Sequence, residues 1–282
     1  MLVDSIDEMR RFLPAIMMKG SPEVFNDALE VAQAALVEDI LGQDLESRLE
    51  KKDEQDRRLL KMVQRIISIQ AFLSAIPEMD LVLTDAGFAV TENEQMAPAS
   101  QQRVQALMQS LASKLDDSKD RLVLFLLRSS DYESWRGTEE FGRLSDGLIM
   151  TFSEFKDVAV LNNITAAAYP KGWSEFLKLS NALNIALMTD VASYISKDYA
   201  EEILERTRDK EPFSHAEQAV LQHVKTAIAA LAMGDRKTGM DQVMEAVTDM
   251  KKDPDSFPTY MASAEAMDLS LSHDDTPVFT MF

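Results

Sequence analysis

The segment from Asp56 to Ile76 restricts the possible folds more than any other part of this sequence. Its apolar residues form two stripes at helical spacing. The stripes consist of Met62, Ile66, Ile69, Leu73 and Ile76 on one side and of Leu60, Val63, Ile67 and Ala71 on the other. A helix that is apolar on two sides is usually central to a bundle, so the sequence predicts a helical bundle around this segment. We expect Pro77 to end the helix, because proline lacks the backbone N–H that a helix interior needs.

Helical periodicity also dominates the rest of the chain. Glycine and proline number nine each among 282 residues, and they fall mostly between the expected helices. The apolar spacing predicts further helices around residues 25–40, 100–115, 173–194, 220–231 and 240–247, after a first short helix that ends before Pro14. The polar residues 42–58 are expected to form a solvated turn of helix and loop.

One stretch departs from this pattern. Leu81–Thr84 and Phe88–Thr91 are β-prone runs, and the three residues that join them include Gly87, which is typical of a β-hairpin. Ser100, just after Pro98, is a suitable N-cap for the next helix. The fold class that follows is mainly α, a multi-helix bundle of two helical halves with a small β-hairpin insertion and an extended C-terminal tail.

Three glycines, Gly137, Gly142 and Gly147, fall within eleven residues and mark the expected boundary between the two halves. We therefore expect four parts. They are an N-terminal helical half (1–136, with the hairpin at about 81–91), a glycine-containing linker (137–150), a C-terminal helical half (151–272) and an extended arm (273–282). The halves echo each other, since "ALVEDILGQDLESRLE" and "ALMTDVASYISKDYAEEILE" both end an amphipathic helix and lead into a charged connection. This similarity suggests the hypothesis that the two halves are repeats of one helix-pair unit.

The charge restricts the partners. A formal net charge of −19 disfavours tight binding of nucleic acid and of anionic membrane surfaces. The longest apolar run, Leu122–Leu127, is too short to span a bilayer, and the first residues lack the order of a signal peptide. With no cysteine, disulfide and thiol chemistry are excluded. These features predict a protein kept in a cytoplasm-like compartment or built into a particle assembled there.

Residues with catalytic patterns are scarce. His215 and His223 are eight residues apart, which is too far for both to reach one metal ion from a helix. His215 follows the expected cap Ser214, and His273 lies in a polar segment, so both are interpreted as surface residues. Neighbouring acidic pairs such as Asp116 and Asp117 lack the spacing of a calcium loop. We expect no catalytic residue, no cofactor and no metal, and therefore no enzyme; a carboxylate–metal enzyme would need three acidic side chains to converge.

Two segments are predicted to contact other protein. An isolated two-stranded hairpin is marginal in water, so it must pack on its own bundle or offer its edge to another chain. The C-terminal sequence "PVFTMF" is apolar, and burying each large side chain there is worth ~1.5–3 kcal/mol. The predicted interaction residues are Leu81, Leu83, Phe88, Val90, Val278, Phe279, Met281 and Phe282.

The stretch from Met79 to Leu107, "MDLVLTDAGFAVTENEQMAPASQQRVQAL", also resembles the signature "LDLVLTxxGFxVxxNxxxAPASxxRVxxL". This signature is that of a family of uncharacterised proteins encoded by phages and prophages of Bacteroides-like bacteria. The matching positions are Asp80, Leu81, Val82, Leu83, Thr84, Gly87, Phe88, Val90, Asn93, Ala97, Pro98, Ala99, Ser100, Arg103, Val104 and Leu107. "RRFLPAI" and "VFTMF" are also similar to that family, so the resemblance covers the N-terminal half well and the C-terminal half loosely.

The family's genes look like neighbours of capsid and tail genes, and the resemblance therefore implies a virion protein at the head–tail junction. It implies a connector (adaptor) or neck protein that forms a homo-oligomeric ring, touches the portal and the tail or other neck proteins, and is assembled in the host cytoplasm. DNA could pass through such a ring without tight binding. The alternative is a cytoplasmic helical protein–protein interaction module without catalytic activity, which would bind a partner helix in a groove.

Overall fold

The structure is a computed structural model that describes residues 1–13, 23–79, 82–84, 87–89, 100–166 and 169–263. The chain divides into two compact units, Met1–Gly142 and Arg143–Phe282, and each is described by itself. Both are built from helices, which confirms the prediction of a mainly α protein. The expected extended arm lies outside the described residues.

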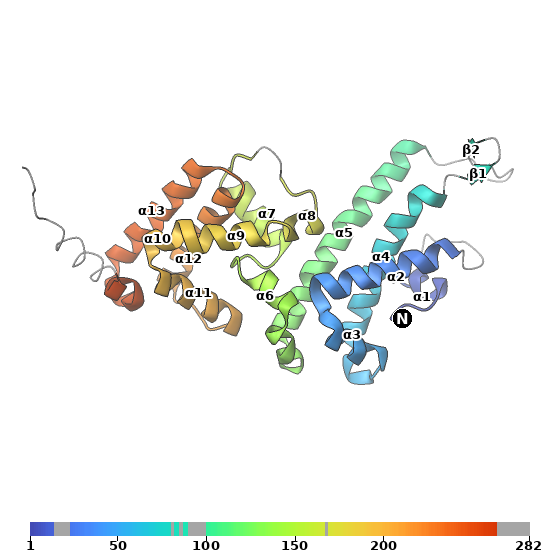
Figure 1. The fold of residues 1–282 in the computed structure, drawn as a ribbon, viewed down its shortest axis with the longest axis horizontal. Helices are drawn as coiled ribbons and strands as arrows, with labels where there is room; N and C mark the ends of the chain where they lie inside the picture. Colours follow the sequence, from blue (N-terminus) through green and yellow to red (C-terminus); the bar gives the residue numbers. More distant parts are fainter. Residues whose placement is uncertain (14–22, 80–81, 85–86, 90–99, 167–168, 264–282) are drawn as a thin grey trace, which may run out of the picture. The chain divides into compact units, whose positions relative to one another are not determined.

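Long helices form the frame of the N-terminal unit (Figure 1). In chain order its helical elements are α1 (Ile6–Arg10), α2 (Glu23–Leu36), the π-helical turn η1 (Val37–Leu41), α3 (Gly42–Glu50), η2 (Glu54–Asp56), α4 (Arg57–Met79), α5 (Gln101–Arg128), η3 (Ser130–Gly137) and α6 (Glu139–Ser145), of which the last crosses the boundary between the units.

Helix α4 is the central helix of this unit, as its two apolar stripes predict. It packs against α1, α2 and α5, and Leu59, Val63, Ile66 and Ile67 have no exposed surface. In the described part of the chain one helical stretch, Glu54–Pro77, is long and apolar enough to cross a membrane, and packing in the unit's core accounts for the same composition. The expected stop at Pro77 is wrong. Helix α4 continues to Met79, since a proline this close to the helix end interrupts only the last turn.

Two other expectations for this unit need correction. Residues 42–50, expected as part of a solvated connection, form α3, which buries Leu45 and Leu49. Only two apolar positions one turn apart anchor this helix, too few for a periodic pattern to stand out. The helix expected to end near residue 115 continues to Arg128, and Ser100 is its N-cap residue without a side-chain hydrogen bond.

A short antiparallel strand pair lies between α4 and α5. Its strands are β1 (Val82–Thr84) and β2 (Gly87–Ala89), and in their register Leu83 pairs with Phe88. The structure describes the backbone of these six residues and leaves the packing of the pair as a prediction.

The C-terminal unit is built from shorter elements. They are α7 (Phe152–Leu161), α8 (Trp173–Leu177), α9 (Ser180–Ile185), the π-helical turn η4 (Ala186–Val191), α10 (Ala192–Ile195), α11 (Lys197–Asp209), α12 (His215–Ala232), α13 (Arg236–Lys252) and η5 (Pro254–Ser256). One long helix over 173–194 was expected, and this is wrong. The helix is interrupted at Lys178 and Leu179, and the segment after α9 is the π turn η4. Interruptions of one or two residues leave the apolar spacing intact, so the sequence pattern does not reveal them.

Helices α12 and α13 form the most closely packed pair of the C-terminal unit (Figure 1). A Cβ atom at Gly239 would lie 2.6 Å from Cγ of Leu231, so only glycine permits this approach. The turn between the helices contains Gly234 at φ +86°.

The segment 137–150, expected as a linker, is folded. It holds α6, and Phe141, Leu144, Leu148 and Ile149 are buried. At Gly147 a Cβ atom would lie 2.7 Å from Cβ of Leu183, whereas at Gly137 and Gly142 it would meet no described atom within 4 Å. Glycines clustered in sequence thus include close packing contacts, which sequence spacing cannot distinguish from linker flexibility.

Candidate interaction surfaces

The structure does not place the interaction residues predicted from the sequence. Leu81, Val90 and residues 278–282 lie outside the described residues, and only the backbone of Leu83 and Phe88 is described. Their role as contact residues stays a prediction. The described residues offer two other surfaces, both on the N-terminal unit.

The first surface is an open pocket of about 560 Å³ between α4 and α5, here called the basic groove. Its lining residues are Arg58, Met62, Arg121, Leu124, Phe125, Arg128 and Ser129. The guanidinium group of Arg58 lies 4.8 Å from the ring centre of Phe125, so a cation–π contact joins the two walls.

Helical spacing brings these residues together. On α4, Arg58 and Met62 are one turn apart on the same face, beside the buried Leu59 and Val63. On α5, the set Arg121, Leu124, Phe125 and Arg128 repeats the i, i+3, i+4, i+7 pattern of one helix face, while Leu122, Val123 and Leu126 are buried. Two helix faces with the same spacing therefore line one groove.

The groove is a basic site in an acidic protein. Helix α4 carries Arg57, Arg58, Lys61 and Arg65 and has no Asp or Glu before Glu78. Arg58, Arg121 and Arg128 form no ion pair with any residue that the structure describes. Clustered, solvent-facing guanidinium groups are typical of sites that bind carboxylates or phosphates.

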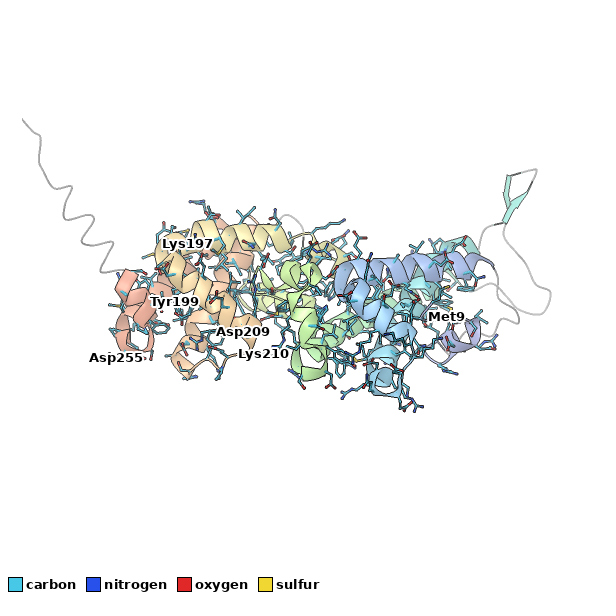
Figure 2. The ribbon with its side chains drawn as sticks, turned by 60° about the horizontal axis from the view of Figure 1, so that its bottom comes forward. Met9, Lys197, Tyr199, Asp209, Lys210 and Asp255 are labelled. Atoms are coloured by element: carbon cyan, nitrogen blue, oxygen red, sulfur yellow. The ribbon has the colours of Figure 1, made fainter. Side chains whose placement is uncertain are left out.

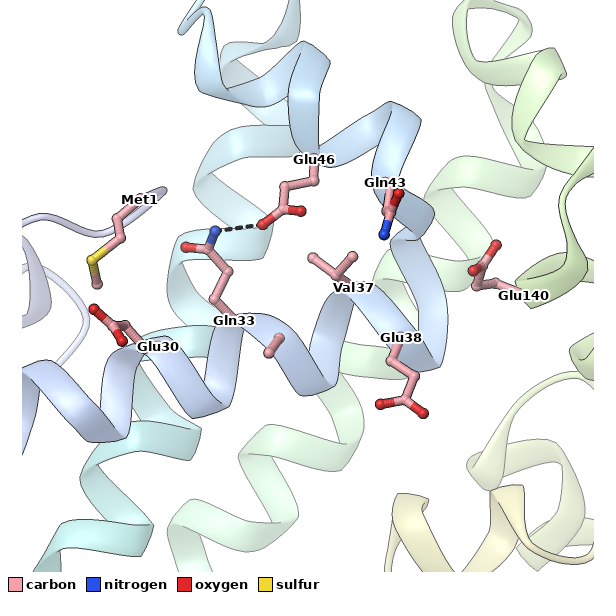
Figure 3. Close-up of a pocket in the computed structure, with 9 residues that line it drawn as sticks. Met1, Glu30, Gln33, Val37, Glu38, Gln43, Glu46 and Glu140 are labelled. Carbon is pink, nitrogen blue, oxygen red and sulfur yellow. Dashed lines mark hydrogen bonds between the residues drawn. The ribbon is translucent and has the colours of Figure 1, made fainter.

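The second surface is an open pocket of about 510 Å³, here called the acidic pocket (Figure 3). It is lined by Met1, Glu30, Gln33, Ala34, Val37, Glu38, Gln43, Glu46 and Glu140. Its carboxylates come from four elements, α2, η1, α3 and α6. Gln33 donates a hydrogen bond of 2.6 Å from Nε2 to Oε1 of Glu46. The pocket is therefore suited to a cationic group.

The backbone at Gly42 shapes this pocket. Gly42 has φ +74°, a conformation that favours glycine, and it ends η1 and begins α3. A Cβ atom there would lie 2.9 Å from Oε2 of Glu140. Glycine thus permits both the sharp turn between the helices and the close position of the Glu140 carboxylate.

A buried ion pair connects several elements of the N-terminal unit. Asp56, with only 1% of its surface exposed, accepts hydrogen bonds from Nε and Nη2 of Arg48 at 2.8 and 2.7 Å and from the Tyr132 hydroxyl at 2.9 Å. The hydrogen bond to Asp56 raises the pKa of Arg48, and burial together with Asp56 raises the pKa of Tyr132 to about 12. Trp135 also donates from Nε1 to the Ile40 carbonyl at 2.6 Å. These hydrogen bonds join η3 to η1 and η2, and α3 to η2.

A second buried charge lies in the same unit. The ammonium group of Lys119 is 3.6 Å from Oδ2 of Asp39, and only 2% of the lysine side chain is exposed. Burial lowers the pKa of Lys119, partly offset by Asp39 and Asp116. This cation lies in the interior and is not offered to a ligand.

In the C-terminal unit the main charged cluster surrounds Arg206, which contacts Glu202, Glu211 and Glu217. Glu217 also completes a capping box with Ser214, as expected for that cap. His223 lies between α12 and α13, with Nδ1 2.8 Å from Oε1 of Gln242. These contacts join helices, and among the residues that the structure describes no group of three or more His, Asp or Glu is arranged to hold a metal ion.

One family model matches the chain. Residues 24–143 match a family of unknown function (DUF6712), and the match falls almost entirely within the N-terminal unit. Searches of the curated proteins and of the solved structures find no match to this chain. The residues matched by the family model include most of those that line the basic groove and the acidic pocket.

Sequence reasoning missed both surfaces. The signal for the groove was present, because 57–77 and 121–128 contain basic residues and no acidic ones in a chain with 48 acidic and 29 basic residues. The acidic pocket had no such signal, since carboxylates are frequent throughout the sequence.

Proposed function

We propose that this protein is a structural protein of the head–tail junction of a tailed phage. In this role it forms a homo-oligomeric ring as a connector or neck protein and contacts the portal and tail or other neck proteins. The hairpin and the C-terminal residues Val278–Phe282 serve as contact segments, and the protein acts in the virion rather than as an enzyme.

One structural observation carries the proposal of assembly. The N-terminal unit exposes three arginines without ion pairs among the described residues, in a groove with apolar walls, although the chain as a whole is strongly acidic. Concentrated charge beside apolar surface is typical of a protein–protein contact. The setting in a virion is supported by the resemblance of Met79–Leu107 to phage and prophage proteins.

Deleting residues 278–282 tests the proposal. We expect the shortened protein to keep its circular dichroism spectrum and to lose assembly, because the apolar end no longer buries its side chains on a neighbour. Sedimentation velocity measures the oligomer, and electron microscopy checks whether it is a ring.

A matched variant keeps the chain length and replaces Val278, Phe279, Met281 and Phe282 by serine. It should lose assembly to the same extent. Normal rings from either variant would contradict the role of the C-terminal segment, and a monomeric full-length chain that binds a helical partner one to one would favour the interaction-module alternative.

A further inference from the structure

We infer that the basic groove of one copy of this protein binds the acidic pocket of the next copy, head to tail. The inference rests on the proposed function, because it takes the assembly to contain adjacent copies of this chain. It assigns the described surfaces that join them.

Charge is the first argument. Arg58, Arg121 and Arg128 are exposed around one groove, and like charges held this close favour an anionic partner. The acidic pocket presents the complementary set, with Glu30 and Glu38 exposed and Glu46 and Glu140 half-buried. Arginine binds carboxylates in a bidentate geometry, so three exposed guanidinium groups and this group of carboxylates are chemically matched.

Apolar surface is the second argument. Leu124 is 38% exposed in the groove, beside Met62 and Phe125. The acidic pocket has Ala34 and Val37 on its wall. Charges at the rim and apolar contacts beside them are the arrangement found in specific interfaces, where the apolar part adds affinity to the electrostatic steering.

The location of the two surfaces is the third argument. The groove is built from α4 and α5, whereas the pocket is built from α2, η1, α3 and α6, and no residue lines both. Two different patches on one unit give a heterologous contact, which leaves a free groove at one end and a free pocket at the other. Such contacts produce a ring when the rotation between copies closes.

Nucleic acid is the competing occupant of the groove, because phosphates also bind arginine. The net charge of −19 opposes the approach of a duplex to this protein, whereas it supplies carboxylates for contacts between copies. A second copy is therefore the occupant that the charges favour, and a nucleic-acid arm belongs in the test.

The experiment compares the original full-length protein with four full-length variants by sedimentation velocity over a range of concentrations. The groove variant carries Arg58→Glu, Arg121→Glu and Arg128→Glu, and the pocket variant carries Glu30→Lys, Glu38→Lys and Glu140→Lys. A combined variant carries all six changes and keeps the net charge of the original chain. The control carries Lys114→Glu, Lys237→Glu and Lys251→Glu at exposed positions outside both surfaces, with the same charge change as the groove variant.

We expect the groove and pocket variants each to raise the dissociation constant for self-association at least about tenfold, as loss of close interfacial charge pairs does. The combined variant should regain most of the affinity, since the reversed charges match again. The control should associate like the original protein, and high salt should weaken all association that depends on these charges. Thermal melts of each variant separate loss of assembly from loss of folding.

If the original protein and the groove variant assemble equally well, the inference is overturned and the proposed function is left intact. The same holds if the control weakens assembly as much as the groove variant does, or if the combined variant fails to recover while it folds normally. A chain that is monomeric at every attainable concentration contradicts both the inference and ring formation. Binding of labelled duplex DNA that the groove variant alone abolishes would reassign the groove to nucleic acid.

Discussion

The two units of this protein use the same unusual sequence of backbone features. In the N-terminal unit a helix passes through the π turn η1 and turns at Gly42, with φ +74° and ψ 163°, into α3. In the C-terminal unit a helix passes through the π turn η4 and α10 and turns at Ser196, with φ +71° and ψ 151°, into α11. π turns are rare, and so is this conformation for a serine. The sequence suggests a repeated helix-pair unit, and such a repeat predicts this shared order of features.

The likeness continues through the next connection. Helix α3 is followed by Lys52 at φ +54°, and α11 by Lys210 at φ +57° (Figure 2 labels Lys210 and the α11 residues Lys197, Tyr199 and Asp209). The next long helix begins five residues later in both units, at Arg57 and at His215. An arginine four residues before the lysine, Arg48 or Arg206, pairs with a carboxylate at the start of that helix.

The two units differ in the burial of the carboxylates that these arginines contact. The N-terminal arginine binds a nearly fully buried carboxylate, Asp56, whereas Arg206 is shared among three glutamates nearer the surface. The groove and pocket belong to the N-terminal unit, which is also the part matched by the family model. The comparison teaches that the same order of backbone features can lie beside an open groove and pocket in one unit and beside an arginine–carboxylate cluster in the other.

The two ion pairs give the largest expected difference. We expect Asp56→Ala to reduce the free energy of unfolding of the N-terminal unit by about 3 kcal/mol, because it leaves Arg48 and the buried Tyr132 hydroxyl without their partner. We expect Glu217→Ala to cost the C-terminal unit only about 1–2 kcal/mol, because Arg206 keeps Glu202 and Glu211.

Each unit has a reporter for this measurement, because the chain has two tryptophans, the buried Trp135 and Trp173, one in each unit. Urea unfolding followed by fluorescence, in backgrounds where one tryptophan is replaced by phenylalanine, gives the two stabilities separately. If Asp56→Ala and Glu217→Ala reduce the free energy of unfolding equally, then burial of the carboxylate does not determine how much each ion pair contributes.

Substitutions of the corner residues Gly42 and Ser196 give smaller effects. Gly42→Ala should destabilise the N-terminal unit by about 1–2 kcal/mol, because alanine is strained at this φ and the Glu140 carboxylate must move. Ser196→Gly should change the C-terminal unit by less than about 1 kcal/mol, since glycine relieves the strain while the hydrogen bond from the Tyr199 N–H to the serine hydroxyl is lost. The same fluorescence assay measures both, and a neutral Gly42→Ala would argue against the shared corner.

A further prediction concerns alkaline pH. The pKa of Tyr132 is raised to about 12 in the folded protein from the ordinary value of 10. Its contribution to stability is therefore complete below pH 10 and is lost as the pH rises toward 12, because the unfolded chain releases this proton first. Tyr132→Phe should flatten the decline of N-terminal stability in this window, and an unchanged pH profile of the phenylalanine variant would contradict the assignment. Burial likewise raises the pKa of Tyr199, which makes Tyr199→Phe the matched variant for the C-terminal unit.

The sequence by itself determined the helical class and the central position of α4, because apolar periodicity records which helix faces avoid water. It also determined the cap at Ser214, which depends on neighbouring residues alone. It could not show that residues 42–50 form a helix, that Pro77 lies inside one, or that Asp56 is buried beside Arg48 and Tyr132, since these depend on contacts between distant residues. The groove was decided by tertiary structure for the same reason: Arg58 and Arg128 are 70 positions apart, and only the packing of α4 against α5 puts both on one surface.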